Sequence, residues 1–252
     1  MSPVKVTFLF SIIFIIFTCY HSTVSKPYEE DRIVGGNFTN IKLIPYIVSV
    51  TMTDELIHNC GGSIIDSNII LTAAHCTQFE EQHLKTMKIR AGSKYSDKDG
   101  EIISVSQIID HESYDSVSKD FDVSILILSE NLVYTDSIQP IKLADERYKS
   151  GTIARVSGWG YESLFADDIS TELKTAFVPI TNWKKCKKNY ELLTENQLCA
   201  GKTNGDDACT ADSGGPLVVD DKLIGIVSYG NGCGIGGVYT DICSLYKFNL
   251  TH

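Results

Sequence analysis

Basic residues are scarce in this chain of 252 residues. It contains 22 lysines and arginines against 32 aspartates and glutamates, which gives a formal net charge of -10. This balance disfavours binding to nucleic acid or to an anionic membrane, and it mildly favours cationic substrates through long-range attraction. The acidity is equally compatible with a role in solubility alone.

Long hydrophobic runs are missing except at the N-terminus. Lys5 precedes an apolar run over 6–17, which is too short to span a bilayer but suits the core of a secretory signal peptide. Small residues allow cleavage after Ser25, and Ser22 is an alternative. The sequence therefore predicts a signal peptide over 1–25 and a secreted, extracellular protein.

Internal repeats, low-complexity tracts and Pro/Gly-rich linkers are absent after residue 32, and helical patterns are rare. Short β-branched runs between turn signals are frequent instead, which is typical of an all-β sandwich or barrel. The clearest runs cover 46–51, 63–71, 102–109, 123–128, 151–157, 216–219 and 222–228. The main helical candidates lie at 182–190 and 244–250. We predict one continuous all-β domain.

Three motifs supply the groups that acyl transfer needs. Small residues crowd Ser213 in TADSGGP, His75 lies in LTAAHC, and Asp122 begins an apolar run. A serine hydroxyl is a poor nucleophile at neutral pH, so it needs a base to take its proton and an acid to orient that base. We expect His58 and His111 to be structural or exposed instead, because neither has the Ala-Ala-His-Cys context.

These motifs, together with IVGG after Arg32, make the chain resemble the trypsin-like (chymotrypsin-fold) serine proteases, including the gut trypsins of arthropods, from about Arg32 nearly to the C-terminus. The order histidine, aspartate, serine supports the resemblance, because other folds carry the same triad in other orders. It implies two six-stranded antiparallel β-barrels, with the active site in the cleft between them and a short C-terminal helix. His75 and Asp122 would come from the first barrel and Ser213 from the second.

The resemblance also implies activation by cleavage. After cleavage of the Arg32–Ile33 bond, the new amino terminus of Ile33 would turn inward and pair with Asp212. Forming this buried pair would order the substrate pocket and the oxyanion hole. Residues 26–32 would then be an activation propeptide and 33–252 the protease domain, so the chain as written would be a zymogen.

The expected specificity is trypsin-like. Asp207 lies six residues before Ser213, where trypsins carry the acid at the base of the specificity pocket, and it predicts cleavage after Arg or Lys. Ala208 replaces the serine common in trypsins, which tilts the preference toward Arg, whose rigid fork reaches a carboxylate directly. The remaining substrate-binding positions would be Ser228, Tyr229, Gly230 and Gly237. Ser228 also resembles the family serine that hydrogen-bonds the catalytic aspartate.

Eight cysteines in an exported protein imply disulfides, whose connectivity a sequence cannot establish. The resemblance suggests the pairs Cys60–Cys76, Cys186–Cys199 and Cys209–Cys233. Cys19 would leave with the signal peptide. Cys243 would then be a free thiol, because the partner that it has in many relatives is absent.

The largest departure from the family is Ala211. This alanine stands where the family carries a glycine whose backbone N–H forms the oxyanion hole with that of Ser213, and losing one such donor costs roughly 100–1000-fold in turnover. A second hypothesis is therefore a catalytically weakened homologue that binds peptides, inhibitors or host proteins in the same cleft.

The remaining expectations concern modifications and partners. Segment 91–103 lacks the paired glutamates of the calcium loop of vertebrate trypsins, so we expect no metal and no cofactor. Asn37 and Asn249 begin glycosylation sequons. We expect a monomer that binds protein or peptide substrates with Arg or Lys, and protein protease inhibitors, but neither nucleic acid nor membranes.

Overall fold

The computed structural model describes residues 36–52, 55–78, 85–160, 170–201, 212–231 and 236–245. The chain divides into two compact units, Met1–Glu30 and Asp31–His252, and every described residue belongs to the second. The expected signal peptide and propeptide lie outside the described residues. Within the described ranges, no helix is long and apolar enough to cross a membrane.

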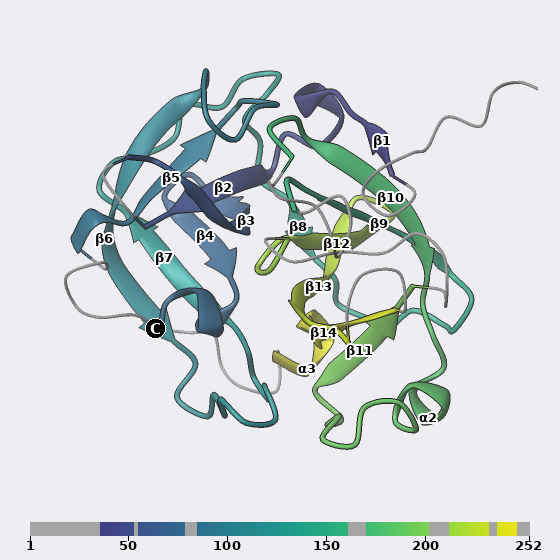
Figure 1. Cartoon of the computed structure of the whole chain (residues 1–252). Coiled ribbons are helices and arrows are strands. Elements are labelled where there is room, and N and C mark those ends of the chain that lie inside the picture. Colours follow the sequence, from purple (N-terminus) through teal and green to yellow (C-terminus); the bar gives the residue numbers. More distant parts are fainter. Residues whose placement is uncertain are drawn as a thin grey trace, which may run out of the picture. The chain divides into compact units, whose positions relative to one another are not determined.

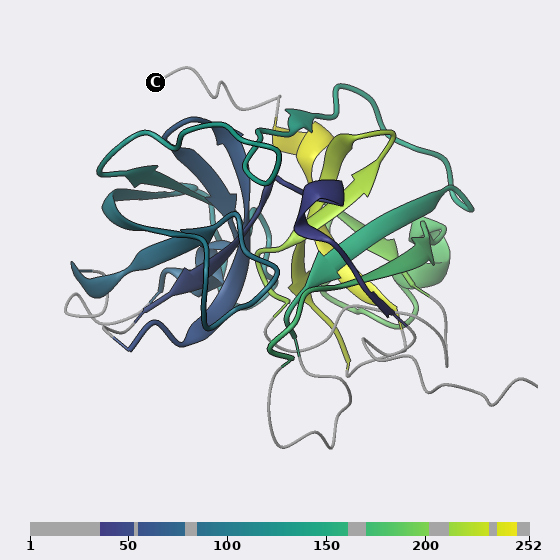
Figure 2. The same cartoon turned by 90° about the horizontal axis from the view of Figure 1, so that it is seen from above.

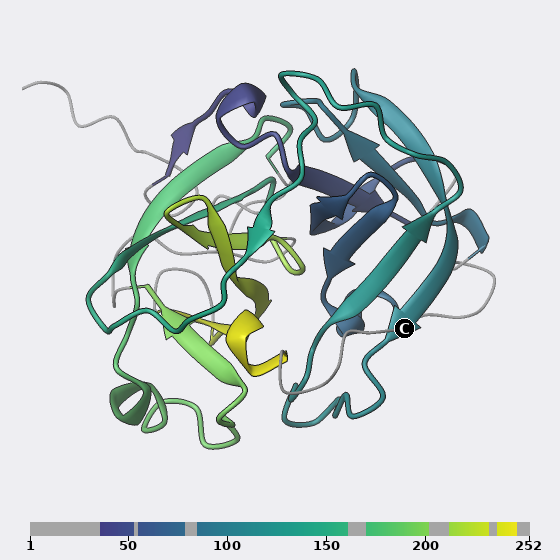
Figure 3. The ribbon, with the colours of Figure 1, turned by 180° about the vertical axis from the view of Figure 1, so that it is seen from behind.

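The first sheet closes into a six-stranded antiparallel barrel (Figures 1 and 3). In chain order its strands are β2 (Ile47–Thr51), β3 (His58–Asp66), β4 (Ile69–Thr72), β5 (Lys88–Ala91), β6 (Glu101–Asp110) and β7 (Ser124–Leu128). They neighbour one another in the order β2-β3-β4-β7-β6-β5. All five residues of β2, IVSVT, are buried, and β-branched side chains suit such a packed, pleated surface.

One expected strand is in fact a hairpin. The run 63–71 was predicted as a single strand, but it divides between β3 and β4 at a turn of Ser67 and Asn68. The backbone N–H of Ser67 donates to Asp66 Oδ1 at 2.6 Å. Aspartate, serine and asparagine favour turns through such local bonds, so DSN was a turn signal inside an otherwise apolar run.

The second sheet has eight strands (Figure 2). They are β1 (Asn37–Phe38), β8 (Lys142–Leu143), β9 (Ile153–Gly158), β10 (Lys174–Pro179), β11 (Gln197–Ala200), β12 (Pro216–Val219), β13 (Lys222–Tyr229) and β14 (Gly237–Asp241). The order is β1-β10-β9-β12-β13-β14-β11, and β8 pairs in parallel with β13.

The second sheet is not closed by a continuous ladder. β11, at one end of the sheet, meets the residue after β10 at an isolated bridge between Ile180 and Ala200, where the N–H of Thr181 donates to Cys199 O at 2.7 Å. The expected all-β fold of two barrels is confirmed, but the second barrel departs from six equal strands. Two of its strands, β1 and β8, have only two residues each, and neither comes from a run that the sequence marked as a strand.

The helices whose full bounds lie in the described residues are short. They are the 3-10 turns η1 (Ile41–Leu43) and η2 (Ala74–Cys76) and the α-helical turns α2 (Trp183–Cys186) and α3 (Ile242–Leu245). Residues 85–86 are also helical. α2 lies within the helical candidate at 182–190. α3 begins two residues before the candidate at 244–250, whose residues from 246 onward lie outside the described part.

Two disulfides connect these turns to the sheets. Cys60–Cys76 joins β3 to η2, and Cys186–Cys199 joins α2 to β11. The third expected pair, Cys209–Cys233, lies outside the described residues. Cys243 has a free thiol whose sulfur lies 3.6 Å from the carbonyl of Ala144.

Candidate active site

His75 is held on a rigid turn beside the first barrel. It lies in η2, where its neighbours Ala73, Ala74 and Cys76 are fully buried and the Cys76 disulfide ties the turn to β3. The backbone N–H of His75 donates to Asp122 Oδ1 at 2.9 Å, and ring atom Nδ1 lies 2.7 Å from Asp122 Oδ2. Because one carboxylate contacts both the backbone and the ring, the orientation of the imidazole is set by a single partner.

Asp122 is completely buried just before β7. Ser228 Oγ, from β13, donates to Asp122 Oδ2 at 2.5 Å, and Thr240 Oγ1, from β14, donates to the backbone carbonyl of Asp122 at 2.8 Å. Burial opposes ionisation, but the hydrogen bond and charge of His75 and the bond from Ser228 outweigh it, so the pKa of Asp122 lies below its ordinary value. The second sheet thus supports a carboxylate that the first barrel carries.

Ser213 lies on a glycine turn that enters β12. Gly214 has a φ of +81°, which favours glycine, and its N–H donates to Val227 O at 2.8 Å. A Cβ at Gly214 would overlap Thr72 Oγ1 and the carbonyl of Gly61. The carbonyl of Ser213 accepts from the N–H of Gly61 at 2.7 Å. The turn therefore packs directly on the end of β4, three residues before His75.

Asp212 is buried immediately before the serine. Its Oδ1 accepts from the N–H of Gly160 at 2.8 Å, and a Cβ at Gly158 would overlap the same oxygen. A carboxylate enclosed in this way needs positive partners around it. Its expected partner Ile33, and Arg32 before it, lie outside the described residues.

The structure places only part of the expected substrate pocket. Gly230 is exposed, Gly237 is buried in β14, and Tyr229 packs edge-on against Tyr190 with ring centroids 5.7 Å apart. Burial raises the pKa of Tyr229 to about 12, so its hydroxyl group stays protonated and the side chain is uncharged at neutral pH. Asp207, Ala208 and Ala211 lie outside the described residues.

The other two candidate histidines have structural surroundings. His58 is buried with Nδ1 2.7 Å from Ser49 Oγ and its ring edge-on to Trp159. His111 stacks on Phe121 with centroids 4.5 Å apart, and burial lowers its pKa. His75, by contrast, contacts Asp122 through both its backbone and its ring.

A clamp between the two sheets was missed by the sequence analysis. Gln197, at the start of β11, donates from Nε2 to the carbonyls of Ser118 and Lys119 at 3.1 and 2.9 Å. Asp120 Oδ1 in turn accepts from Thr194 Oγ1 at 2.6 Å and from Asn196 Nδ2 at 3.1 Å. We call these two sets of bonds the cleft clamp.

The cleft clamp fixes the loop that leads to Asp122. The two segments that form it, SVSKDFD and TENQ, lie more than seventy residues apart in the chain. Their polar character was therefore the only signal of this contact in the sequence.

The loop that holds calcium in vertebrate trypsins is occupied here by a side chain. The buried guanidinium of Arg90 donates to the carbonyls of Ser96 (3.1 Å), Asp97 (3.1 Å) and Asp99 (2.5 Å). Ser93 Oγ, near one expected ligand position, donates to Lys98 O at 2.8 Å. Carbonyls already bound to a cationic group do not fit an added Ca²⁺ ion, which takes six to eight oxygen ligands.

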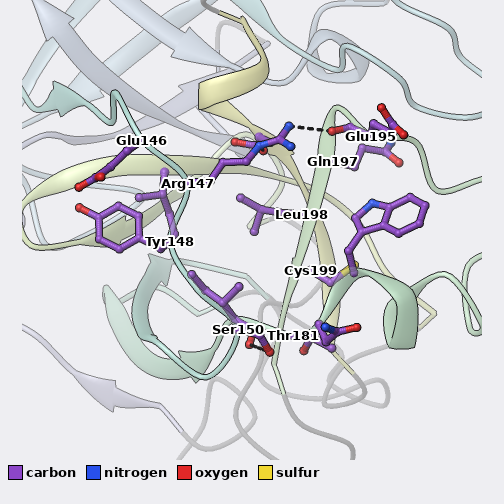
Figure 4. A pocket seen from close by; sticks show the side chains of 14 residues that line it. Glu146, Arg147, Tyr148, Ser150, Thr181, Glu195, Gln197, Leu198 and Cys199 are labelled. Atoms are coloured by element: carbon purple, nitrogen blue, oxygen red, sulfur yellow. Dashed lines mark hydrogen bonds and ion pairs between the residues drawn. The ribbon is translucent and has the colours of Figure 1, made fainter.

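A hollow of about 460 Å³ lies on the second sheet and is distinct from this site (Figure 4). Arg147 crosses it, pairing with Asp241 at 2.6 Å and donating to the carbonyl of Glu195 at 2.8 Å. Leu198 and Trp183 also line it. None of His75, Asp122 and Ser213 lines it, so it is separate from the candidate active site.

The family model and the sequence relatives of this chain point to the same protein family. A protein-family model described as Trypsin matches residues 33–248. The chain is 41% identical over 211 residues to a protein named Trypsin from Simulium vittatum, covering 80% of this chain and 84% of that protein. It is 37% identical to Trypsin 5G1 of Aedes aegypti, covering 86% of this chain and 83% of the relative. For Trypsin alpha of Drosophila erecta the identity is 36%, with 89% of each chain covered.

Among solved structures, one titled neuropsin, a serine protease expressed in the limbic system of mouse brain, superposes with a TM-score of 0.76. Its sequence is 30% identical, and the match covers 84% of this chain and 96% of that one. The sequence and fold comparisons therefore agree.

Proposed function

Because this chain belongs to the trypsin family and is a trypsin-like serine endopeptidase, we propose that Ser213, His75 and Asp122 are its catalytic triad. The observation that carries the assignment is the double contact of Asp122 with the backbone and the ring of His75. With Nδ1–H donated to the carboxylate, Nε2 is left to accept a proton. The turn at Ser213 packs against the strand end that leads to this histidine.

The chemistry follows from that arrangement. Ser213 Oγ attacks the scissile carbonyl while its proton passes to His75 Nε2, and the N–H groups of Ser213 and Ala211 stabilise the oxyanion. The imidazolium then protonates the leaving amine as the C–N bond breaks, which leaves an acyl group on Ser213. Water attacks this ester with His75 again acting as base, the imidazolium returns that proton to Ser213 Oγ as the acyl C–O bond breaks, and the acid product departs. Asp122 keeps its charge throughout and stabilises the imidazolium.

The enzyme is made as a zymogen and exported in this proposal. Residues 1–25 direct export, cleavage after Arg32 removes 26–32, and the Ile33 ammonium pairs with Asp212. The support from the described residues is that Asp212 is fully buried, since a buried carboxylate favours a cationic partner. The protease domain 33–252 then acts outside the cell as a monomer.

Specificity for Arg, then Lys, is proposed from Asp207 at the pocket base and Ala208 beside it. Ser228, Tyr229, Gly230 and Gly237 form the rest of the pocket, and protein inhibitors that present Arg or Lys occupy the same cleft. Profiling the activated enzyme on a peptide library tests this: Arg at the cleaved position should dominate, and Asp207→Ser should remove the preference. A preference for Phe or Leu in the natural enzyme contradicts it.

A fluorophosphonate probe tests the central proposal. After limited cleavage by trypsin, the purified chain should be labelled at Ser213, and N-terminal sequencing should read Ile33. Ser213→Ala should abolish labelling with cleavage unchanged, and Arg32→Gln should block both cleavage and labelling. If neither the cleaved natural protein nor cleaved Ala211→Gly is labelled, the triad assignment fails. If uncleaved protein is labelled fully, the zymogen proposal fails while the triad stands.

Ala211 favours a second candidate function, a weakened homologue that binds in its cleft. Ala211→Gly distinguishes the two. A gain of a few-fold or less in acylation rate means that the oxyanion hole is already formed in the natural chain. That result supports the active-enzyme hypothesis. A gain near the full effect of a missing donor, roughly 100–1000-fold, means that the natural chain is nearly inactive.

A further inference from the structure

An apolar patch lies on the outer face of the second sheet. In β9 and β10 the buried residues Ala154, Val156, Ala176 and Val178 face one way into the core. Their alternating neighbours face outward, and Phe177 is 60% exposed and Ile153 54% exposed. Leu43 of η1, at 65%, adds to the patch. Large exposed apolar side chains that gather in one place mark a surface that something covers.

The register places Asn37 at this patch. Asn37 of β1 pairs with Thr175 of β10, so the two side chains lie on the same face of the sheet, and Phe177 is the diagonal neighbour two residues along. Phe177 itself pairs with Arg155 of β9. Asn37 is exposed, and together with Leu43, Arg155 and Phe177 it lines a hollow of about 180 Å³. A group attached to Asn37 would therefore lie over this hollow.

Phe38 also lines the hollow, but strand alternation directs its side chain to the opposite face of the sheet from Asn37 and Phe177. Its ring is 66% exposed and lies 4.6 Å from the ammonium of Lys174, its partner in the strand register. A cation on one face holds the ring in place. Arg155 is only partly engaged, because Nη2 donates to the Tyr46 hydroxyl at 2.9 Å and lies 3.4 Å from Asp221 Oδ1, while its buried Nε has no hydrogen-bond partner among the described residues. The face that Asn37 shares thus carries the exposed apolar side chains of Leu43 and Phe177, with Arg155 beside them.

We propose that Asn37, in the sequon Asn37-Phe38-Thr39, carries an N-linked glycan whose first sugar residues cover Leu43 and Phe177. In this step Asn37 Nδ2 loses a proton and bonds to the anomeric carbon of an oligosaccharide. The bond from that carbon to a lipid diphosphate carrier breaks, and the diphosphate leaves with the electron pair. The apolar face of a pyranose ring packs on an aromatic ring, while its hydroxyl groups face water. The inference rests on the proposed export, because the donor is met on that route.

Glycopeptide mass spectrometry of the full chain secreted from insect cells tests the modification. Asn37 should be occupied in the natural chain, in Thr39→Ser, which keeps the sequon, and in Asn249→Gln, which removes only the other one. Asn37→Gln and Thr39→Ala should both lose the mass of one glycan. Secreted protein with an unmodified Asn37 overturns the inference and leaves export standing, whereas retention of the chain in the cytosol overturns both.

The packing of the glycan is tested by its release from native protein with a peptide N-glycosidase. Phe177→Ser should speed release about fivefold, because it removes the ring against which the sugar is buried. Leu192→Ser, which removes a similarly exposed apolar side chain elsewhere, should not change the rate. Equal rates for the natural chain and Phe177→Ser overturn the packing. A glycosylated natural chain that sediments as a dimer, with Phe177→Ser monomeric, assigns the patch to a second copy and overturns it too.

Discussion

The two halves of the proposed catalytic site are held by different means. His75 and Asp122 are positioned by side chains, some of which reach across from the second sheet, as Ser228 and Thr240 do. The turn at Ser213 is positioned by backbone bonds and by the absence of a side chain at Gly214. The histidine and aspartate depend on particular hydrogen-bond donors and acceptors. The serine turn depends on having no Cβ atom at Gly214.

Because of this difference, different kinds of substitution should disturb each half. A substitution that changes one donor or acceptor should disturb the histidine and aspartate while leaving the fold intact. A substitution that adds one carbon should disturb the serine turn through its packing, with no change in any ionisable group. The four predictions below separate these two kinds of damage.

The largest effect is expected from Asp122→Asn in the activated enzyme. The amide keeps the shape of the carboxylate but presents a donor where His75 Nδ1–H needs an acceptor, so the imidazole adopts the wrong tautomer. We expect kcat to fall about 10⁴-fold at neutral pH, with the melting temperature changed little. Kinetics with a small amide substrate and a thermal melt measure the two quantities. Loss of folding instead would show that Asp122 is mainly structural.

Gly214→Ala should damage the other half through sterics. The added Cβ overlaps Thr72 and Gly61, and the positive φ is strained for alanine, so we expect a loss of about 3 kcal/mol in the free energy of unfolding. Gly151→Ala is the matched control, because Gly151 also has a positive φ, of +91°, but nothing lies within 4 Å of its Cβ position. It should lose about 1 kcal/mol. Urea unfolding of both variants measures the difference, and equal losses would refute the role of packing at Gly214.

Ser228→Ala should remove the hydrogen bond by which the second sheet supports Asp122. It removes one of the bonds that lower the pKa of Asp122, so that pKa should rise toward its ordinary value, and kcat should fall about tenfold. The stability that a lowered carboxyl pKa contributes is present above the unfolded value of 3.8 and is lost as the pH falls through the folded value. The variant should therefore start to lose stability at a higher pH than the natural chain.

Urea unfolding at a series of acid pH values checks whether Ser228→Ala starts to lose stability at a higher pH than the natural chain. Asp122→Asn is the reference that has no carboxyl group at this position. Identical acid profiles for Ser228→Ala and the natural chain would contradict the account of the Asp122 pKa.

Much of this site could be predicted from the sequence because its parts are local. Small residues around Ser213 and the alanines before His75 are visible in single segments, and the β-branched runs of β2 and β7 predict strands directly. The turn at Ser67 and Asn68 was also local and was overlooked within an apolar run. The role of Arg90 could not be predicted, because it depends on where the carbonyls of the following loop point.

The cleft clamp could not be predicted for a related reason. Its two sides, around Asp120 and Gln197, meet only after both sheets have folded, and a polar segment by itself does not identify its partner. The long-range pairs are recognised only from the folded chain.

The cleft clamp gives the smallest expected effect, since it acts on Asp122 through the preceding loop. Gln197→Met keeps the length of the side chain but leaves the carbonyls of Ser118 and Lys119 without their donor, so the loop that leads to Asp122 should loosen. We expect kcat to fall about fivefold, the equivalent of one hydrogen bond, with KM for a short Arg substrate nearly unchanged. Gln139→Met is the control, because Gln139 likewise donates from Nε2 to a backbone carbonyl, that of Thr135 at 2.8 Å, but on an exposed loop. If the two variants lose activity equally, the clamp does not position the aspartate. If only Gln197→Met loses kcat, and adding Ser228→Ala gives less than the product of the separate losses, both act on the same carboxylate.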